Sequence, residues 1–440
     1  MKTALTIAGS DSSGGAGIQE DLKVFSAFGV HGMCAITAVT AQNTKGVRRI
    51  EFLSPGIVSE QIDSVLCDFK IGAAKTGMLG NAEICDAVYR KLSEYNVENL
   101  VVDPVMVSTS GTDLLELSDS RTLENLRKLT KISMLTTPNV HEAEILSGIK
   151  IKNHRDMERA AEKIGNCIIT GGDFRSDKEA GYVVDLLFFD CEFLVFRNKK
   201  NNSVIHGTGC TFSAAITAGL AEGCDILTSI KKAESFTSDL IEHNLPAGIS
   251  GSLNILNPNM QMERFCVKEN VRKAVEKLVS CENTYKLAPE VGINIAMAIP
   301  HAKTLDGISG VSGRIVRAGQ KLIPAGEIEF GCSRHVGRIV LTAMKFNSDK
   351  RAAMNVKFSD DILKICRELN LTITGFERSK QPGDTKTMEW GTKTAIESSC
   401  CFPDVIYDRG SVGKEAMIRI LGEDALSVVC IARKIGERLS

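Results

Sequence analysis

The sequence predicts a two-domain α/β protein, in which a domain with a mainly parallel sheet flanked by helices precedes a second, smaller α/β domain. The chain has 440 residues, more than one hydrophobic core usually organises. Residues 3–245 alternate short apolar runs with amphipathic segments, which indicates parallel strands joined by right-handed crossovers. The segment Pro246–Asn259 is rich in Gly, Pro, Ser and Asn, and the alternation resumes after it. We therefore expect domains over 1–250 and 265–440, joined by a linker over 251–264.

The first domain is expected to place a strand at each of its apolar runs, namely Ala4–Ala8, Cys34–Thr40, Ala74–Gly77, Leu100–Asp103, Met134–Thr136 and Ile168–Thr170. Helical spacing puts four residues on one face of the first helix: Ile18, Leu22, Phe25 and Gly29. Further helices are predicted over Ile84–Tyr95, over Met157–Ile164 and from about Cys210. Tyr182–Phe189 and Phe193–Phe196 flank Asp190-Cys191 and predict an antiparallel hairpin at the sheet edge.

The second domain is expected to open with a helix over Val267–Val279 and to continue with strands around Ile293–Ile299, Ala353–Phe358 and Leu371–Phe376. Helices are predicted over Arg334–Phe346, Ile362–Leu369 and Ala425–Leu439, and a glycine-rich stretch covers Gly307–Gly319. About 170 residues is a normal size for one domain.

The composition excludes several classes of protein. Lys+Arg is 53 and Asp+Glu is 54, so no basic excess favours nucleic acid. No apolar run reaches the roughly 20 residues that span a bilayer, and Met1–Gly9 is too short for a secretory signal. The 14 cysteines form no C-x-x-C pair, which is typical of thiols in a reducing compartment. We expect a cytoplasmic protein that binds neither nucleic acid nor membrane.

Two glycine-rich turns are candidate phosphate sites. Gly9–Gly17 links the first strand to the first helix, where glycines let the backbone approach a ligand closely. It lacks the lysine of a Walker P-loop, and a simple tight turn is its alternative. His206–Ala215 opens an alanine-rich helix whose converging amides favour a phosphoryl group. Cys210 falls in its first turn, where a helix end lowers the thiol pKa, or it packs as a small apolar residue.

Two carboxylates follow apolar strands. Asp103 and Glu142 are expected at the carboxyl ends of a parallel sheet, where ligands bind. Carboxylates there suit Mg²⁺ that bridges nucleotide phosphates. Asn139, three residues before Glu142, has helix capping as its alternative role.

These motifs resemble the ribokinase-like superfamily, and within it the ThiD-type hydroxymethylpyrimidine and hydroxymethylpyrimidine-phosphate kinases. The resemblance covers residues 3–245 and is strongest at Ile7–Gln19, Ile36–Thr44, Asp103–Val105 and Gly207–Thr211. It implies two successive transfers from ATP, from alcohol to monophosphate and then to diphosphate. We expect a homo-oligomer, a dimer formed through the kinase domain.

The resemblance also implies roles for individual residues. The positions that line the pyrimidine pocket are Gly9, Asp21, Gln42, Met78 and Val105. Gln42 donates and accepts hydrogen bonds at once, which suits a ring nitrogen and its amine; a solvent-facing Gln42 and a surface Asp21 are the alternatives. Asn139 and Glu142 match an N-x-x-E motif associated with Mg²⁺.

Phosphoryl transfer is implied at the second turn. Cys210 stands where ribokinases carry an aspartate base, and it is interpreted as a base or as a purely positional group. The amides of Gly207, Thr208, Gly209 and Cys210 are expected to carry most of the electrostatic stabilisation, and Asp103 is a further catalytic candidate. One departure concerns Ile169–Asp173, where Thr170 replaces a lysine that the family carries near the nucleotide phosphates.

In the second domain, Gly307–Arg314 is interpreted as a flexible loop that ends in a guanidinium. Ser333 is a natural N-cap, and Arg334 and His335 follow it in the first turn of the next helix. Cations sit badly at a helix N-terminus, so their presence indicates a bound anion such as diphosphate. The alternative is a solvated surface arginine and a packed histidine.

This segment, about residues 265–440, resembles the ThiN-type thiamine-phosphate synthase domain. The shared stretches are Ile295–Ala298, Gly310–Gly319, Ser333–His335 and Met354–Phe358. The family's essential Arg and His map onto Arg314 and His335, with four further polar candidates: Asn355, Lys357, Asp408 and Arg409. The implied reaction joins hydroxymethylpyrimidine diphosphate to thiazole phosphate and releases diphosphate.

Two alternatives stay open at this point. The second domain is a module that senses thiamine phosphate without turnover, or the first is a pyridoxal-type kinase. Arg314 and His335 favour catalysis over sensing, and Gln42 with the Cys210 turn favours the pyrimidine.

Overall fold

The computed structural model describes residues 1–108, 111–172, 181–199, 205–248, 253–382, 386–411 and 413–439. The chain forms two compact units, Met1–Asn259 and Met260–Ser440. Through the part of the chain that is described, no helix combines the length and the apolar character that crossing a membrane requires.

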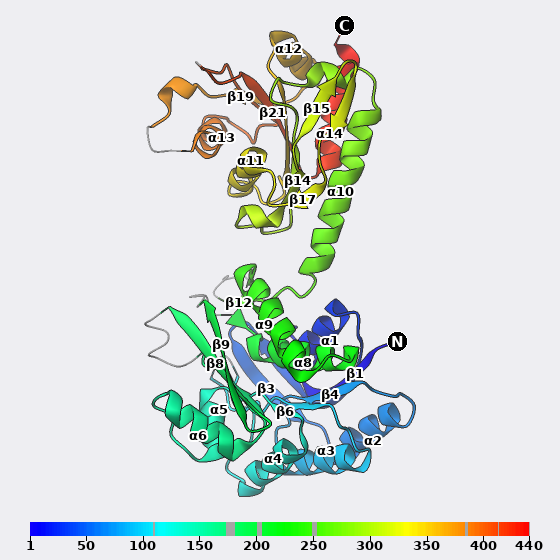
Figure 1. Ribbon diagram of the computed structural model, residues 1–440, viewed down its shortest axis with the longest axis vertical. Helices are drawn as coiled ribbons and strands as arrows, with labels where there is room; N and C mark the ends of the chain where they lie inside the picture. The colour runs from blue at the N-terminus through cyan, green and yellow to red at the C-terminus, as the bar shows by residue number, and fades with distance from the viewer. Residues whose placement is uncertain are drawn as a thin grey trace. The chain divides into compact units, whose positions relative to one another are not determined.

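The first unit is built on a nine-stranded sheet of order β3-β2-β1-β4-β5-β6-β7-β8-β9 (Figure 1). Its strands are β1 (Thr3–Ser10), β2 (His31–Asn43), β3 (Gly46–Phe52), β4 (Ala73–Thr76), β5 (Leu100–Val102), β6 (Leu135–Thr136), β7 (Cys167–Ile169), β8 (Tyr182–Phe189) and β9 (Glu192–Lys199). The six neighbouring strands β2, β1, β4, β5, β6 and β7 pair in parallel, and β8–β9 is an antiparallel hairpin at the sheet edge. Both predictions are therefore confirmed. The opposite edge strand β3 was not predicted, because exposed Arg48, Arg49 and Glu51 interrupt its apolar pattern.

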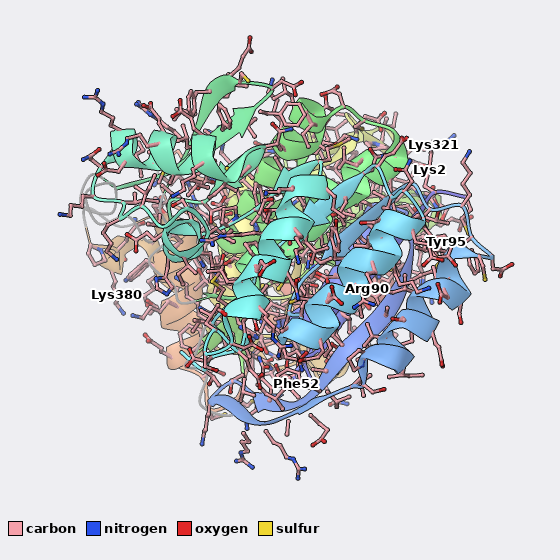
Figure 2. All side chains as sticks on the ribbon, turned by 90° about the horizontal axis from the view of Figure 1, so that it is seen from below. Lys2, Phe52, Arg90, Tyr95, Lys321 and Lys380 are labelled. Carbon is pink, nitrogen blue, oxygen red and sulfur yellow. The ribbon has the colours of Figure 1, made fainter. Side chains whose placement is uncertain are left out.

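Helices cover both faces of this sheet. They are α1 (Gly17–Ala27), α2 (Pro55–Leu66), α3 (Ala82–Glu94), α4 (Ser120–Ile132), α5 (Val140–Ser147), α6 (His154–Ile164), α8 (Thr208–Glu222) and α9 (Ile226–Glu242). The pleat of β1 divides them: Ala4 packs in a core with α1, α8 and α9, whereas Leu5 packs in a core with α2, α3 and α4. Figure 2 looks onto the second of these layers, where Arg90 lies on the outer surface of α3.

A small sheet of order β10-β12-β11 leads the chain into α8. Its strands are β10 (Ile205–His206), β11 (Leu245–Ala247) and β12 (Leu253–Ile255). The parallel pair of His206 with Ile255 fixes the residue that directly precedes the Gly207 turn.

The helices of the first unit differ in how their N-termini are capped. Side chains of Ser54, Asn81, Asp119, Asn153 and Asp225 cap the helices α2, α3, α4, α6 and α9. In contrast, α1 and α8 begin at Ala16 and Gly207 without a side-chain cap. Their first N–H groups therefore donate hydrogen bonds to loop atoms or remain available to a ligand.

The second unit has a seven-stranded sheet of order β17-β14-β13-β18-β21-β20-β19, with the separate ribbon β15–β16. The strands are β13 (Ile295–Ala298), β14 (Ile308–Val311), β15 (Ile315–Ala318), β16 (Lys321–Pro324), β17 (Ile328–Phe330), β18 (Ala352–Lys357), β19 (Ile373–Gly375), β20 (Val405–Asp408) and β21 (Met417–Gly422). Every pair in this sheet is antiparallel except β19–β20.

The helices of the second unit are α10 (Met260–Ser280), α11 (Arg334–Met344), α12 (Asp360–Glu368), α13 (Thr387–Glu397) and α14 (Ala425–Arg438). One face of the sheet packs against α11 and α13. The other packs against α10 and α14, which also contact each other (Figure 1).

Two sequence expectations need correction here. The stretch Gly307–Gly319 is no flexible loop, because Ile308–Val311 is a fully buried strand, β14, and Ile315–Ala318 is β15. Helix α10 begins at Met260, inside the predicted linker 251–264 and before the predicted start at Val267. Met262 and Phe265 are exposed in its first turns, so no inward apolar pattern marks them as helical. Residues 251 and 252 lie outside the described residues.

Candidate functional site

The two glycine-rich turns of the first unit pack against each other. A Cβ at Gly207, whose φ is 84°, would lie 1.9 Å from the carbonyl oxygen of Gly15. A Cβ at Gly15 would in turn lie 2.8 Å from His206 Cδ2. Only glycine permits this approach of two backbones, so the predicted motifs form one site.

Asp11 fixes the first turn. Its carboxylate accepts hydrogen bonds from the N–H groups of Ser13, Gly15 and Ala16 and lies 3.1 Å from His206 Nε2. Burial alone would raise the pKa of Asp11, but the hydrogen bonds from His206 and Ser13 hold it below its ordinary value. The ionised carboxylate therefore fastens the loop to the residue ahead of α8.

Gln42 reaches the same histidine. Its Nε2 lies 3.2 Å from His206 Nε2, and its backbone exchanges hydrogen bonds of 2.7 and 2.8 Å with the Ser12 hydroxyl. The side chain is half-buried, which excludes the alternative of a free solvent-facing glutamine. Gln42 thus contacts His206, the residue that directly precedes the turn that carries Cys210.

The apolar members of the predicted pocket also meet. A Cβ at Gly9 would lie 2.8 Å from Met78 Sδ, so the strand passes directly beneath the methionine. Met78 packs in a cluster with Ala38 and Leu114, and Val105 packs against that cluster. An apolar cluster beside an amide suits a small aromatic ring.

Asp21 is the remaining residue of the predicted pocket. Its side chain has no exposed surface, so the alternative of a surface charge is wrong. Asp21 Oδ2 accepts a 2.6 Å hydrogen bond from the Thr6 hydroxyl and lies 3.1 Å from Lys75 Nζ. The side chain of Asp21 is therefore engaged by Lys75 and Thr6 in the interior of the unit.

Three polar side chains form a row beneath the site, which we call the charged row: Thr6, Lys75 and Asp103. Each stands two residues after an apolar residue of the α8-facing core, namely Ala4, Ala73 and Val101. The pleat therefore points all three toward α1 and α8, at adjacent strands β1, β4 and β5. Lys75 Nζ lies 3.8 Å from Asp103 Oδ2, which accepts a 2.8 Å bond from the Ser213 hydroxyl of α8.

Sequence reasoning missed Lys75. Its signal was a lysine inside the apolar strand Ala73–Thr76, where a charge requires a buried partner. Although burial opposes its charge, the carboxylates of Asp21 and Asp103 raise its pKa well above the usual range. Lys75 is therefore a fixed cation close to Cys210.

Cys210 differs from its predicted state. The helix start was expected to lower its thiol pKa, but burial raises the pKa of Cys210 to about 12. Lys75 and a hydrogen bond from the Gly17 backbone act in the opposite direction, and the charge of Asp103 adds to the rise. The residue keeps some exposed surface, yet at neutral pH its sulfur carries a proton.

Asn139 and Glu142 form a capping box at the start of α5. Asn139 Oδ1 accepts from the Glu142 N–H, and Glu142 Oε2 accepts from the Asn139 N–H, both at 2.9 Å. Glu142 Oε1 also accepts a 3.3 Å bond from Met106 N–H, which ties it to the loop after Asp103. Helix capping, which was the alternative role for Asn139, is therefore observed. Among the described residues, no three His, Cys, Asp or Glu side chains gather as metal ligands.

Thr170 lies beside this cap. It forms a parallel bridge with Asn139, and its N–H donates a 2.9 Å bond to the Pro138 carbonyl. Asp173, the last residue of the departing motif, lies outside the described residues.

The second unit has its own polar row, formed by Asn294, Asn355, Arg419 and Asp408. Each stands two residues from an apolar residue that packs against α11, namely Ala296, Ala353, Leu421 and Ile406. Four neighbouring strands therefore direct a buried polar side chain to one face, at one end of the sheet. Buried polar side chains at matching positions of neighbouring strands are more typical of a ligand-binding site than of ordinary core packing.

Hydrogen bonds connect members of the polar row, and the start of α11 packs closely against the neighbouring strand β14. Asn355 Oδ1 accepts a 2.7 Å bond from Asn294 N–H, and its Nδ2 donates to the Gly292 carbonyl at 3.0 Å. A Cβ at Gly310 would lie 2.8 Å from Ser333 Cβ and 3.4 Å from Asn294 Oδ1. Ser333 is the N-cap residue as predicted, but its side chain makes no capping bond.

Arg314 and His335 lie on the solvent side of this row. Both residues are exposed, and a Cβ at Gly292 would lie 3.4 Å from Arg314 Cβ. Partial burial, followed by the charges of Arg314, Arg338, Arg419 and Arg378, lowers the pKa of His335. Four guanidiniums therefore contribute positive potential at this imidazole. Such a potential suits an anionic ligand.

The further polar candidates of the second unit do not all lie in the polar row. Asn355 and Asp408 belong to the polar row, whereas Arg409 is exposed, lies 3.5 Å from Asp360 and stacks on Phe358. Arg378 and Arg419, which sequence reasoning missed, bind the Asp408 carboxylate. The signal for Arg419 was a charge within the apolar strand Met417–Gly422. A hollow of about 680 Å³ lies at the other end of α11, beside Phe346 and Trp390, and none of the polar row lines it.

Comparison with known families matches both units. The phosphomethylpyrimidine kinase model matches residues 11–254, and the thiamine-phosphate synthase ThiN model matches residues 270–434. The bifunctional thiamine biosynthesis protein ThiDN of Methanocaldococcus jannaschii is 34% identical over 429 residues, which cover 97% of this chain and 96% of that protein. The hydroxymethylpyrimidine/phosphomethylpyrimidine kinase of Bacillus subtilis is 44% identical over 251 residues, covering 56% of this chain and 91% of the relative.

Solved structures agree for the first unit. An ADP complex of Bacillus subtilis pyridoxal kinase matches with a TM-score of 0.54 and 33% identity, over 59% of this chain and 98% of that one. Pyridoxal kinase of Staphylococcus aureus with pyridoxal matches with a TM-score of 0.52 and 31% identity, over 59% and 93% of the two chains. The predicted ribokinase-like fold is confirmed.

Proposed function

Because this chain belongs to the family of bifunctional thiamine biosynthesis proteins that join a phosphomethylpyrimidine kinase to a ThiN-type thiamine-phosphate synthase, we propose that its two sites act in turn on one pyrimidine. The chain is a kinase for hydroxymethylpyrimidine and its phosphate, followed by a thiamine-phosphate synthase. The contact that carries the kinase assignment is Gln42 against His206, since it joins the ring-binding wall to the phosphoryl turn.

In the first site, we assign the ring to Gln42, Met78 and Val105, above Gly9. The hydroxyl oxygen attacks the γ-phosphorus of ATP, and the bond from that phosphorus to the β-bridging oxygen breaks as ADP leaves. The hydroxyl proton passes to an oxygen of the transferred phosphoryl group and from there to water. The monophosphate oxygen repeats this attack on a second ATP. The uncapped amides of Gly207, Thr208 and Gly209 face the charge that spreads over the transferring oxygens.

Cys210 is assigned a positional role. A thiol whose pKa lies near 12 is protonated at pH 7, which disfavours an ionised base. We assign it to orient the substrate hydroxyl, while Lys75 supplies a fixed positive charge below. Asp103 holds Lys75 and, through Ser213, the first turn of α8.

ATP is supported by the matched kinases, whose structures hold ADP in one case and AMP-PCP in another. Mg²⁺ that travels with ATP needs only one or two carboxylates, so the sparse acidic residues here fit it. Glu142 would hold it, because its carboxylate lies at the start of α5 beside the loop after Asp103, and the capping box with Asn139 would orient Glu142. The metal ion supplies charge neutralisation on the phosphates.

In the second site, the bond between the pyrimidine methylene carbon and diphosphate breaks, and a bond to the thiazole nitrogen forms. Arg314 is assigned to the departing diphosphate, and His335 to its oxygen atoms as charge develops. The electron-rich aminopyrimidine stabilises the carbon centre, so no protein nucleophile is assigned.

A matched pair of variants tests the division of labour. Gly209 is exposed and lies in the first turn of α8, and a Cβ at this position would have no neighbour within 4 Å. Gly209→Asp therefore fits the fold and adds a negative charge among the phosphate-facing amides, while Gly209→Asn has the same shape without the charge. With hydroxymethylpyrimidine, ATP, Mg²⁺ and thiazole phosphate, Gly209→Asp should leave the alcohol unconsumed and Gly209→Asn should keep most turnover.

Arg314→Ala should instead accumulate the pyrimidine diphosphate, which chromatography separates from thiamine phosphate. Arg314→Ala that still makes thiamine phosphate at the wild-type rate would refute the assignment of the second site. Equal turnover by Gly209→Asp and the wild type would refute the first.

A further inference from the structure

The buried charges of the second unit are unbalanced. Asp408 has no exposed surface, and two guanidiniums bind it: Arg378 Nε at 2.6 Å from Oδ1, and Arg419 Nη2 at 2.6 Å from Oδ2. Arg378 Nη2 donates a second bond of 3.1 Å to Oδ2, so the guanidinium of Arg378 binds the carboxylate in a bidentate manner. Two cations on one carboxylate leave one positive charge uncompensated within the group.

The geometry orients Arg378 outward. Its Nη2 also donates to the Glu415 carbonyl at 3.3 Å, whereas its Nη1 makes no hydrogen bond within the described part of the chain. The side chain is 10% exposed, while Arg419 behind it is 3% exposed. Arg419 is further held by the Met417 carbonyl and the face of Phe376. Arg378 is thus a rigid guanidinium with two donors available at the surface.

This group lies beside the assigned synthase site. Arg419 pairs in register with Asn355 of β18, and Asn355 bonds to Gly292, against which Arg314 packs. The charges of both Arg378 and Arg314 lower the pKa of His335, so both arginines contribute positive charge to the same site. They come from different elements, a loop after β19 and a turn before β15, and do not share a carboxylate.

The chemistry requires more than one anion subsite. Both substrates of the second reaction carry phosphate, and both must be held at once for carbon and nitrogen to meet. A single exposed arginine cannot bind a diphosphate and a separate phosphate ester. We propose that Arg378, fixed by Asp408 and backed by Arg419, is a second phosphate-binding residue of the synthase, separate from Arg314. The proposal rests on the function proposed for this unit.

A purely structural role is the competing explanation. An Arg–Asp–Arg group ties the loop after β19 to strands β20 and β21, and its loss would lower stability without affecting one substrate more than the other. The two roles differ in a KM measured against each substrate in turn, because structural damage lowers the amount of active enzyme and leaves KM unchanged.

The test uses the full chain with pyrimidine diphosphate supplied directly. Arg378→Lys keeps the charge but loses the fork, Arg378→Met loses both, and Arg409→Met is the matched control on a neighbouring exposed arginine. We expect KM for thiazole phosphate or for pyrimidine diphosphate to rise at least tenfold in Arg378→Met and by a smaller factor in Arg378→Lys. Arg409→Met should keep both KM values, and the substrate whose KM rises identifies the phosphate bound.

Unchanged KM values for both substrates in Arg378→Lys and Arg378→Met, with an active wild type, would overturn this inference alone. If Arg378→Met does not fold, Arg378→Lys decides by itself. A wild type that makes no thiamine phosphate from the two supplied substrates would instead overturn the proposed function, so the two failures are distinguishable.

Discussion

Lys75 Nζ lies 3.1 Å from Asp21 Oδ2, and neither side chain has any exposed surface. Asp103 lies 3.8 Å from the same ammonium group and bonds to Ser213 of α8. One buried cation thus links β4, α1 and β5 beneath the first turn of α8. Each charge compensates the hydration that the others have lost.

Replacing Lys75 by Met should destabilise the first unit by about 3–5 kcal/mol, because it leaves two buried carboxylates without their cation. Hydrogen exchange of amides in β1 and β4 in the full chain measures this loss without assuming two-state unfolding. The double variant Lys75→Met/Asp21→Asn should recover part of the loss. Equal stabilities for the single variant and the wild type would contradict the ion-pair account.

Cys210 should behave as a protonated thiol. Its pKa of about 12 predicts that iodoacetamide at pH 8 alkylates it at least roughly tenfold more slowly than the exposed Cys67, as followed by peptide mass spectrometry. Cys210→Ala should lower the kinase kcat by less than about tenfold, since loss of a general base costs about 10²–10⁴. Fast alkylation, or a loss above 10², would restore the role of an ionised base.

Glu20 should make the first unit less stable as pH rises. Burial raises its pKa from 4.5 to about 7, although Lys23 and the Thr211 hydroxyl oppose the rise. Between these values the folded state keeps a proton that the unfolded chain has released, so stability falls from pH 4.5 to 7 and then levels off. Glu20→Gln should add about 2–3 kcal/mol at pH 8 and remove this pH dependence. Glu51→Gln, at an exposed position, serves as the control and should change neither.

His335 should take up a proton when diphosphate binds. Its pKa lies below 6.5 in the free protein, so the ring is mainly neutral at pH 7, and an anion beside it raises the pKa. Calorimetric titration with inorganic diphosphate in two buffers of different ionisation enthalpy reports the proton count. His335→Asn should bind with no uptake from this site. Identical proton counts for the variant and the wild type would show that His335 does not contact the anion.

Most of the first unit follows from local sequence. Apolar runs and helical spacing locate its central strands, and glycine-rich turns locate the phosphate site. The charged row is less visible, because Thr6, Lys75 and Asp103 come from separate strands and only the sheet register brings them together. The Cys210 pKa depends on enclosure by α1, α8 and the row, which no local pattern contains.

The second unit is harder to derive from sequence for the same reason. Antiparallel strands such as β20 and β21 are short, and the polar row interrupts their apolar alternation. The glycine spacing of Gly307–Gly319 resembled a loop, yet Gly310 is there because Ser333 packs against its strand. Arg378 acquires its role only through Asp408, 30 residues further along the chain.

The most direct test of two separate sites is complementation between variants. A mixture of Gly209→Asp, which lacks kinase activity, and Arg314→Ala, which lacks synthase activity, receives hydroxymethylpyrimidine, ATP, Mg²⁺ and thiazole phosphate. The account predicts thiamine phosphate from the mixture and none above background from either variant alone, because the diphosphate made at one intact site reaches the other. A mixture as inactive as its components, while each variant keeps its remaining half-reaction, would contradict it.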